Sequence, residues 1–368
     1  MCGGAGAVRI ASAMADETTR DRLAASLRRG DLATWPYDHA YAARAADPRA
    51  LLAEARSVVC LAFPYSAPAP GHDDALRGRV SRYAWSRDYH RRIGEMLAGI
   101  ARRIDELFGR SVTALACDTK PLAERAFAAR SGLGWIGKHT NLIAPGLGSF
   151  VFLGEIVTSL QLPIDPPLRT HCGTCRRCID LCPTGALRGD YTIDATRCIA
   201  DLTQRTDAIP RELRARMGTW VWGCDLCQEV CPPTGRAPQA GDPSNAPLDA
   251  EAAAPSLRAL LRLRSGEFKR RYAKTAMGWR GAAVLRRNAA VALGNTMDPS
   301  AVPDLAAALE CDPHPMVRGH VAWALGRIGS PSALAALAAR AEREGDPGVL
   351  GEIRLALEPF APASRLDA

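Results

Sequence analysis

The chain carries cysteines at a spacing that suits iron-sulfur chemistry. Between Cys172 and Cys182 they follow the pattern C-x2-C-x2-C-x3-C, with a proline after the last. This spacing is typical of proteins that hold cubane four-iron, four-sulfur clusters through cysteine thiolates. A second, altered copy runs from Cys224 to Pro232 and lacks one cysteine, which Cys198 upstream can supply. The eight thiolates predict two 4Fe-4S clusters.

The spacing also predicts which cysteines share a cluster. In two-cluster modules of this kind, the first three cysteines of a run bind one cluster and the fourth binds the other. The first predicted set is Cys172, Cys175, Cys178 and Cys231, and the second is Cys182, Cys198, Cys224 and Cys227. Crossed ligands bring the clusters close together, so the module is expected to deliver electrons one at a time to another centre.

Two other uses of cysteine are open. Paired C-x2-C motifs also hold structural zinc, although zinc ribbons need neither the third cysteine of the run nor the proline. Disulfides are rare in a reducing cytoplasm. The first residues contain too short an apolar run for a signal peptide, and no stretch reaches the length of a membrane span. We therefore expect a cytoplasmic protein with no membrane contact.

Length and charge limit what surrounds the clusters. The chain has 368 residues, enough for about two or three domains, with ordinary globular composition. Its formal net charge of +8 favours a polyanionic partner. Pro-rich linkers divide it into three predicted segments: an α/β segment over 1–160, a ferredoxin-like module over 161–235 and a helical segment over 236–368.

The first segment is expected to contain the catalytic site, to which the clusters deliver their electrons. Apolar runs predict strands over 57–62, 111–116 and 149–159, and an amphipathic pattern predicts a helix over 89–107. Asp118 follows the second of these strands. If burial raised its pKa, it could donate a proton to a departing oxygen, although an aspartate after a strand is more often a helix cap.

Arg125 is near enough in sequence to share the pocket with Asp118. The glycine-rich loop 131–141 follows, and its spacing matches neither a Walker loop nor a dinucleotide fingerprint. The histidines His72, His90, His314 and His320 are expected to be structural rather than ligands.

The last segment contains a repeat. Residues 286–294 recur as 318–326, a shift of 32 residues, and 356–357 continue the register. Each copy is followed by a proline turn and another Ala/Leu-rich helix. The pattern predicts two or three helical hairpins of the HEAT or armadillo kind, with an ordinary helical bundle as the alternative.

Basic residues are concentrated around the first copy. Aromatic residues at Phe268, Tyr272 and Trp279 lie among them, and few carboxylates balance the charge. Guanidinium groups that pair with phosphates and aromatic rings that stack on bases indicate RNA binding, although a charge run is often only a solvated face. The predicted RNA-binding residues are Lys269, Arg270, Arg271, Lys274, Arg280, Arg286 and Arg287.

These motifs together resemble a known family. Residues 46–49 with 55–57, 81–83 with 88–90, and 132–138, together with the cysteines and the terminal repeats, closely resemble epoxyqueuosine reductases. The resemblance covers about residues 40 to 330. The first forty residues differ, being short and irregular where the family commonly has an ordered lead-in.

The resemblance implies the cofactor, substrate and site. It implies a cobalamin in the first domain and a tRNA carrying epoxyqueuosine at the anticodon wobble position, whose epoxide oxygen is removed as water to leave queuosine. Asp118 matches the family's proton donor and Arg125 a neighbouring pocket residue. The residues implied to bind cobalamin are Arg56, Asp118, Lys138, Asn141, Leu142, Ile143, Ala144 and Leu153.

We expect a monomer that accepts electrons from a donor such as flavodoxin or ferredoxin. Two alternatives are open. A cobalamin and iron-sulfur reductase of a small molecule would need no basic repeat segment, and a noncatalytic electron carrier would need no cobalamin.

Overall fold

The computed structural model describes residues 4–32, 35–68, 76–109, 112–238 and 242–360. His72 lies outside the residues that the structure describes. The chain forms two compact units, neither of them continuous in sequence. The first comprises Met1–Pro68, Trp85–Cys198 and Asp225–Ala246, and the second comprises Ala69–Ala84, Ile199–Cys224 and Pro247–Ala368. These units cut across the three contiguous segments drawn from the sequence.

The first unit is built on a four-stranded sheet. Its order is β1 (Ala7–Ser12), β2 (Ser57–Pro64), β7 (Val151–Thr158) and β4 (Thr113–Ala116), and every neighbouring pair is antiparallel. The predicted strands are confirmed, except that Ser111 lies outside the described residues. The α/β pattern does not produce a parallel sheet here, because alternation of helices and strands does not determine strand direction.

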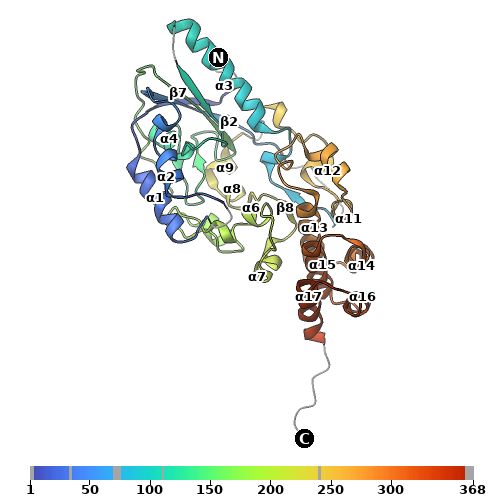
Figure 1. Cartoon of the computed structure of the whole chain (residues 1–368). Helices are drawn as coiled ribbons and strands as arrows, with labels where there is room; N and C mark the ends of the chain where they lie inside the picture. The colour runs from blue at the N-terminus through green and yellow to red at the C-terminus, as the bar shows by residue number, and fades with distance from the viewer. Residues whose placement is uncertain (1–3, 33–34, 69–75, 110–111, 239–241, 361–368) are drawn as a thin grey trace. The chain divides into compact units, whose positions relative to one another are not determined.

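Helices cover both faces of this sheet (Figure 1). α3 (Tyr89–Phe108) packs on one face, where Ile93 and Leu97 are fully buried. A Cβ on Gly154 of β7 would lie 3.0 Å from Ile93 and 3.1 Å from Leu97, so the missing side chain permits this close approach. α4 (Glu124–Arg130) packs on the other face.

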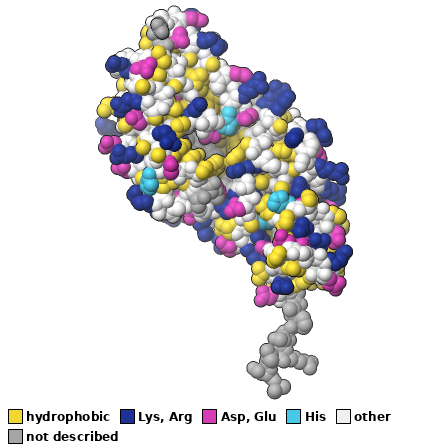
Figure 2. All heavy atoms as spheres, viewed as in Figure 1, with side chains coloured by type: hydrophobic (Ala, Val, Ile, Leu, Met, Phe, Trp, Pro, Cys, Tyr) yellow, Lys and Arg dark blue, Asp and Glu magenta, His cyan; other side chains and the backbone are white. Residues whose placement is uncertain are grey.

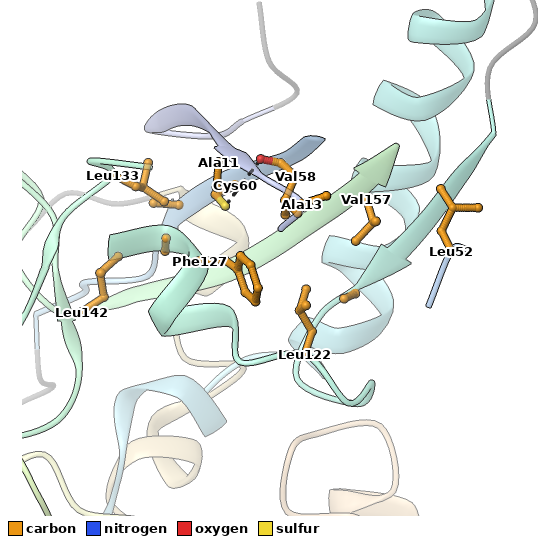
Figure 3. Packing of buried hydrophobic residues seen from close by; sticks show 13 residues of the cluster. Ala11, Ala13, Leu52, Val58, Cys60, Leu122, Phe127, Leu133, Leu142 and Val157 are labelled. Atoms are coloured by element: carbon orange, nitrogen blue, oxygen red, sulfur yellow. Dashed lines mark hydrogen bonds between the residues drawn. The ribbon is translucent and has the colours of Figure 1, made fainter. Parts of the chain in front are cut away.

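The α4 face carries the larger apolar core. Cys60 and Val58 of β2, Val157 of β7 and Phe127 of α4 belong to one buried cluster, drawn in Figure 3. Strand residues two apart share a face, so Glu155 lies on the same side of β7 as Val157. An acidic group therefore stands on an apolar face.

The described residues among the first forty form regular elements, contrary to the expectation of an irregular segment. β1 adds an outer strand to the sheet, and α1 (Glu17–Arg28) and α2 (His39–Ala45) follow it. Asp16 and Asp38 cap the two helices by accepting backbone N–H groups of Thr19 and Tyr41. Each helix therefore has its own local start signal.

Short elements make up the rest of the first unit. The glycine loop forms a small ladder of β5 (Trp135–Ile136) and β6 (Leu142–Ile143). The cysteine-rich stretches carry α5 (Arg177–Leu181), η3 (Ala195–Arg197), α8 (Leu226–Glu229) and α9 (Pro232–Arg236). The remaining 3-10 turns of this unit are η1 (Pro48–Ala50) and η5 (Pro243–Asn245).

The second unit is mainly helical. Its strands β3 (Arg79–Val80) and β8 (Trp220–Trp222) form a short parallel pair. Its helices before the repeats are α6 (Ile199–Leu202), α7 (Arg211–Arg214), α10 (Ala250–Ala253), α11 (Leu257–Leu261) and α12 (Ser265–Tyr272). The 3-10 turns are η2 (Arg82–Ala84), η4 (Ala215–Met217), η6 (Pro299–Ala301) and η7 (Glu358–Phe360).

The predicted repeat is confirmed as stacked helices. These helices are α13 (Ala282–Thr296), α14 (Val302–Cys311), α15 (Pro315–Ile328), α16 (Pro331–Ala341) and α17 (Pro347–Leu357). Figure 1 shows α13, α15 and α17 in one row. A Cβ on Gly294 would lie 2.8 Å from the Cα of Ala324, and one on Gly326 would lie 2.9 Å from the Cα of Ala356. The repeated glycine thus allows each inner helix to pack closely on the next.

Candidate active site

Asp118 lies just beyond the end of β4, in a backbone conformation unusual for a residue with a side chain. Its φ is 61°, in the left-handed region that aspartate tolerates better than most residues. Its backbone N–H donates to the carboxyl group of Glu124, the first residue of α4. Its side chain is 64% exposed. The carboxyl group is therefore held in place yet open to a substrate.

The start of α3 supplies the partners of this carboxyl group. The Tyr89 hydroxyl donates to Asp118 Oδ2 at 2.6 Å, and His90 Nε2 lies 3.2 Å from the same oxygen. On the other side of the ring, His90 Nδ1 lies 2.6 Å from Asp88 Oδ1. Asp88, His90 and Asp118 thus form a carboxylate–imidazole–carboxylate row.

The expected rise in the pKa of Asp118 is wrong. The hydrogen bond to His90 lowers this pKa most, and Tyr89 and the charge of Arg125 add to the effect, although burial opposes it. Burial lowers the pKa of His90, but Asp118 and Asp88 outweigh it and raise the pKa to about 9. At neutral pH the proton therefore rests on the imidazole, and Asp118 is ionised. His90, expected to be structural, belongs to the site.

Aromatic rings fix the position of Tyr89. Its ring stacks on Phe152 of β7 with centroids 4.2 Å apart and planes 8° apart. Phe152 also stacks on Tyr65 at 4.2 Å, and Tyr89 stacks on His90 at 4.0 Å. Sequence spacing gave no sign of this stack, because its members come from three separate segments.

Arg125 is near Asp118, as expected. Its guanidinium donates to the carbonyl of Thr140 at 2.8 Å, tying α4 to the glycine loop, and its charge lowers the pKa of Asp118. Tyr37 and Tyr41 stack at 4.1 Å, and burial raises the pKa of both, with a smaller contribution from the charge of Asp118. Sequence spacing gave no sign of these two tyrosines near Asp118.

The residues implied to bind cobalamin are not all at one place. Ser57 and Thr113 begin their strands at the same end of the sheet, so Arg56 lies at the end opposite Asp118. The side chains of Leu142, Ile143 and Ala144 are buried in the core. Any contact they make with a bound group would be through the backbone. Arg56 is not brought to the site.

Lys138 and His139 have defined roles in the glycine loop. Lys138 Nζ donates to the carbonyls of Gly173 and Cys175 at 2.8 and 3.1 Å. His139 Nδ1 accepts the backbone N–H of Asn141 at 3.2 Å, and burial lowers the pKa of His139 to about 4. The neutral ring therefore carries its proton on Nε2. Within the described residues this nitrogen and the Trp135 Nε1 are buried without a partner.

The thiols of the first predicted set affect one another's pKa, as neighbouring groups do. Burial raises the pKa of Cys178 to about 11, and the charges of Cys172, Cys231 and Cys175 contribute. Burial likewise raises the pKa of Cys231, to which Cys172 and Cys175 also contribute. Grouped cysteines of this kind suit an iron-sulfur cluster, which binds them as thiolates. The second set remains a prediction.

Two features are absent from the described residues. No group of three or more His, Cys, Asp or Glu is arranged to hold a single metal ion. Cysteines that bind a cubane stand around four irons rather than one, so their sulfurs need not converge on a point. No helix in the described part of the chain is long and apolar enough to cross a membrane.

Two predicted RNA-binding arginines are structural instead. Arg287 is fully buried and donates to the carbonyls of Leu202, Arg205 and Asp207. Arg286 makes a bidentate salt bridge to Asp312 at 2.6 and 3.1 Å. Arg318, one repeat later, pairs in the same way with Glu344 at 2.8 and 2.9 Å. Arg286 therefore forms a salt bridge that recurs at the same position of the next repeat.

The rest of the basic cluster is mixed. Phe268 and Tyr272 are buried and unable to stack on bases, and Arg271 lies 3.5 Å from the carboxylate of Glu267. Lys269, Arg270 and Lys274 are exposed, and Figure 2 shows basic side chains on the surface in the region of α12. Trp279 is 50% exposed, with the guanidinium of Arg280 3.6 Å from its ring centroid.

Three family models match separate parts of the chain. Residues 45–119 match the family described as epoxyqueuosine reductase QueG. Residues 171–234 match a 4Fe-4S double cluster binding domain, and residues 280–358 match HEAT repeats. The predicted cluster module and helical repeats are thereby confirmed.

Whole proteins and solved structures are similar over most of the chain. An epoxyqueuosine reductase of Bacillus anthracis is 38% identical over 74% of this chain and 73% of its own. A crystal structure of epoxyqueuosine reductase with an epoxyqueuosine-modified tRNA-Tyr stem loop has a TM-score of 0.90 and 33% identity, covering 96% of this chain and 95% of its own. One from Bacillus subtilis, with its catalytic aspartate loop swung out of the active site, has a TM-score of 0.89 and 33% identity over the same shares.

Proposed function

Because the chain belongs to the epoxyqueuosine reductase family, we propose that it reduces epoxyqueuosine to queuosine in tRNA with Asp118 as the proton donor. The reduction breaks both C–O bonds of the epoxide, forms a C=C bond and releases water, so it takes up two electrons and two protons. The observation that carries the role of Asp118 is the row Asp88–His90–Asp118, with distances of 2.6 and 3.2 Å. It joins an exposed carboxyl group to a protonated imidazole.

The electrons enter through iron-sulfur clusters. We assign the first cluster to Cys172, Cys175, Cys178 and Cys231, and the second to Cys182, Cys198, Cys224 and Cys227. The mutual effect of the first four thiols on their pKa values supports the first assignment. A one-electron carrier protein such as flavodoxin or ferredoxin would reduce them, and the enzyme would act as a monomer.

Cobalamin is the proposed second cofactor. Buried donors without a partner, Trp135 Nε1 and His139 Nε2–H, lie in the glycine loop. They fit a ligand whose periphery carries amide carbonyl acceptors, because burying such donors unpaired is costly. When bound, cobalamin supplies a low-potential cobalt centre that two-electron chemistry at carbon requires.

The chain's own residues position Asp118 and supply its proton. Tyr89 and the Glu124 carboxyl group hold Asp118 in its loop, from the side chain and the backbone respectively. Asp118 cannot deliver a proton while it is ionised. His90 Nε2–H is the adjacent source, because it lies 3.2 Å from Asp118 Oδ2. Asp88 stabilises the imidazolium until the opening epoxide oxygen draws the proton through Asp118.

The second unit is the proposed tRNA surface. Lys269, Arg270 and Lys274 are exposed and suited to phosphate contacts. The exposed Trp279, with Arg280 over its ring, offers a face for an unpaired base. Salt-dependent binding of tRNA would distinguish this function from reduction of a small molecule, which needs no basic surface.

The test is an anaerobic assay with reconstituted clusters, cobalamin, a chemical or protein reductant and tRNA that carries epoxyqueuosine. Digestion and mass spectrometry should show conversion to queuosine, lighter by one oxygen. Conversion that persists without cobalamin would exclude the cofactor assignment. A protein with clusters and tRNA affinity but no conversion would be a noncatalytic carrier.

A further inference from the structure

Thr184 has a fully buried hydroxyl group beside an assigned ligand of the second cluster. It lies two residues after Cys182, and it is 0% exposed. Its Oγ1 lies 3.6 Å from Cys182 Sγ, which is within hydrogen-bonding distance for sulfur. In the described part of the chain, this sulfur is the only hydrogen-bond partner of the hydroxyl group.

The chemistry of a cluster ligand determines the direction of this hydrogen bond. A cysteine binds iron as a thiolate, which has no proton to donate. The hydroxyl of Thr184 therefore donates to Cys182 Sγ when a cluster is bound. Hydrogen bonds to a charged acceptor are roughly twice as strong as those between neutral groups. Because Thr184 is buried, water does not compete for its hydroxyl group.

The chain between Cys182 and Cys198 folds back on itself as a hairpin. The backbone N–H of Asp194, near the end of this stretch, donates to the carbonyl of Ala186, near its start, at 2.9 Å. The two arms of the hairpin therefore run side by side, and both arms lead to assigned ligands of the second cluster.

Arg197 links the residues next to these two ligands. Its Nε donates to the carbonyl of Thr184 at 2.8 Å, and Cys198 follows it in the chain. The backbone beside Cys182 is thus hydrogen-bonded to the side chain beside Cys198. This arrangement fits two cysteines that bind one cluster, and it holds the backbone of Thr184 in place.

The N-terminal part of the chain anchors the same hairpin. The side chain of Asp31, which follows α1, is 1% exposed and accepts a hydrogen bond from Arg188 at 2.6 Å. The backbone carbonyl of Asp31 accepts the N–H of Ala195 at 2.9 Å. Both arms of the hairpin are therefore attached to a segment that is distant in sequence, and Thr184 lies in a well-supported position.

We propose that the hydroxyl of Thr184 raises the reduction potential of the second cluster by donating to Cys182 Sγ. Reduction adds one electron, and part of its charge spreads onto the cysteine sulfurs. A donor to sulfur therefore stabilises the reduced cluster more than the oxidised one. A one-electron carrier protein then reduces this cluster more easily. The inference rests on the proposed function, from which it takes the ligands of the second cluster.

The test is a redox titration of the anaerobically reconstituted holoenzyme, followed by electron paramagnetic resonance. Thr184→Val keeps the shape of the side chain and removes the hydroxyl group. The equilibrium constant for reduction of the second cluster should fall roughly tenfold, which makes its potential more negative by about 59 mV for one electron. The first cluster should keep its potential. Thr158→Val is the control, because Thr158 at the end of β7 is equally buried, and both potentials should be unchanged.

A second pair of variants separates the hydroxyl group from the packing around it. Thr184→Ser and Thr184→Ala both remove the methyl group, and they differ by one hydroxyl. The serine variant should have a potential close to that of wild type, whereas the alanine variant should shift as Thr184→Val does. Equal potentials in the serine and alanine variants would show that the hydroxyl has no effect and would overturn the inference.

Lys138→Met identifies the cluster that each signal reports. Lys138 donates to the carbonyls of Gly173 and Cys175 in the first cysteine run, so its replacement acts on the first cluster. Lys138→Met and Thr184→Val should therefore shift different signals. A shift of the same signal in both variants would mean that Thr184 does not act on the second cluster, and the inference would be wrong.

Failure of the proposed function can be distinguished from failure of the inference. If wild-type protein converts no tRNA while Thr184→Val shifts the second potential as expected, the proposed function fails and the inference holds. If wild-type protein binds about four irons per chain instead of about eight, it has no second cluster, and the inference is overturned together with the ligand assignment.

Discussion

His90 Nε2 lies 3.2 Å from Asp118 Oδ2, while its Nδ1 lies 2.6 Å from Asp88. The imidazole thus bridges two carboxyl groups, and its raised pKa of about 9 means that it arrives at the reaction charged. We propose that this pair, rather than one acid, is the proton donor, with Asp118 facing the substrate and His90 holding the proton.

The first prediction concerns Asp118→Asn. Asparagine keeps the shape and can still accept from Tyr89, but it cannot relay a proton. We expect the variant to bind clusters, cobalamin and tRNA normally and to lose turnover by about 1,000-fold. Visible spectra and a single-turnover assay would check this. The exposed Asp21, 70% exposed on its side chain, gives the control Asp21→Asn, and full activity of Asp118→Asn would refute the assignment.

The second prediction concerns the pH dependence set by His90. The pKa is raised above its ordinary value of 6.5, so the imidazolium contacts are fully present below that value and are lost as the pH rises through about 9. The wild-type rate should therefore fall above about pH 9. His90→Gln should lack this step and be slower at neutral pH by roughly 100-fold. His314→Gln is the control, and an unchanged pH profile in His90→Gln would contradict the relay.

The third prediction concerns Lys138. Its ammonium donates to carbonyls within the first cysteine run, at Gly173 and Cys175. A positive charge beside a cluster favours the added electron, so Lys138→Met should make the reduction potential of the first cluster more negative. A redox titration followed by electron paramagnetic resonance measures this. Lys274→Met should leave both potentials unchanged, and an equal shift in both variants would argue against a local effect.

The fourth prediction separates structural from RNA-binding arginines. Arg287→Met leaves the carbonyls of Leu202, Arg205 and Asp207 without a donor in the core. We expect a loss of about 3 kcal/mol in the free energy of unfolding, because buried polar groups are then unpaired. Denaturant unfolding of the second unit would show it. Arg270→Ala, at an exposed position, should change stability by less than about 0.5 kcal/mol.

The fifth prediction concerns tRNA affinity. Lys269→Ala and Arg270→Ala should weaken binding, and each should reduce the slope of log affinity against log salt by about 1. Binding titrations at several salt concentrations measure this slope. Arg354→Ala, on the exposed surface of α17, serves as the control. Unchanged slopes would place the tRNA elsewhere.

The sequence by itself determined the cysteine module, the helical repeat and the position of Asp118. Each of these is a local pattern, since cluster ligands, a 32-residue period and an aspartate after a strand are visible in short windows of the chain. The repeat was recognisable for a further reason. Gly294 and Gly326 recur because each inner helix packs closely on the next at these positions.

Only the tertiary structure decided what surrounds these patterns. Arg286 and Arg287 read alike in sequence, yet one forms a salt bridge with Asp312 and the other is buried among carbonyls. The sheet is antiparallel, and the apolar pattern of a strand does not reveal the direction in which it pairs. The protonation of the site depended on two segments meeting, since Asp118 after β4 and His90 in α3 change each other's pKa through the hydrogen bond between them.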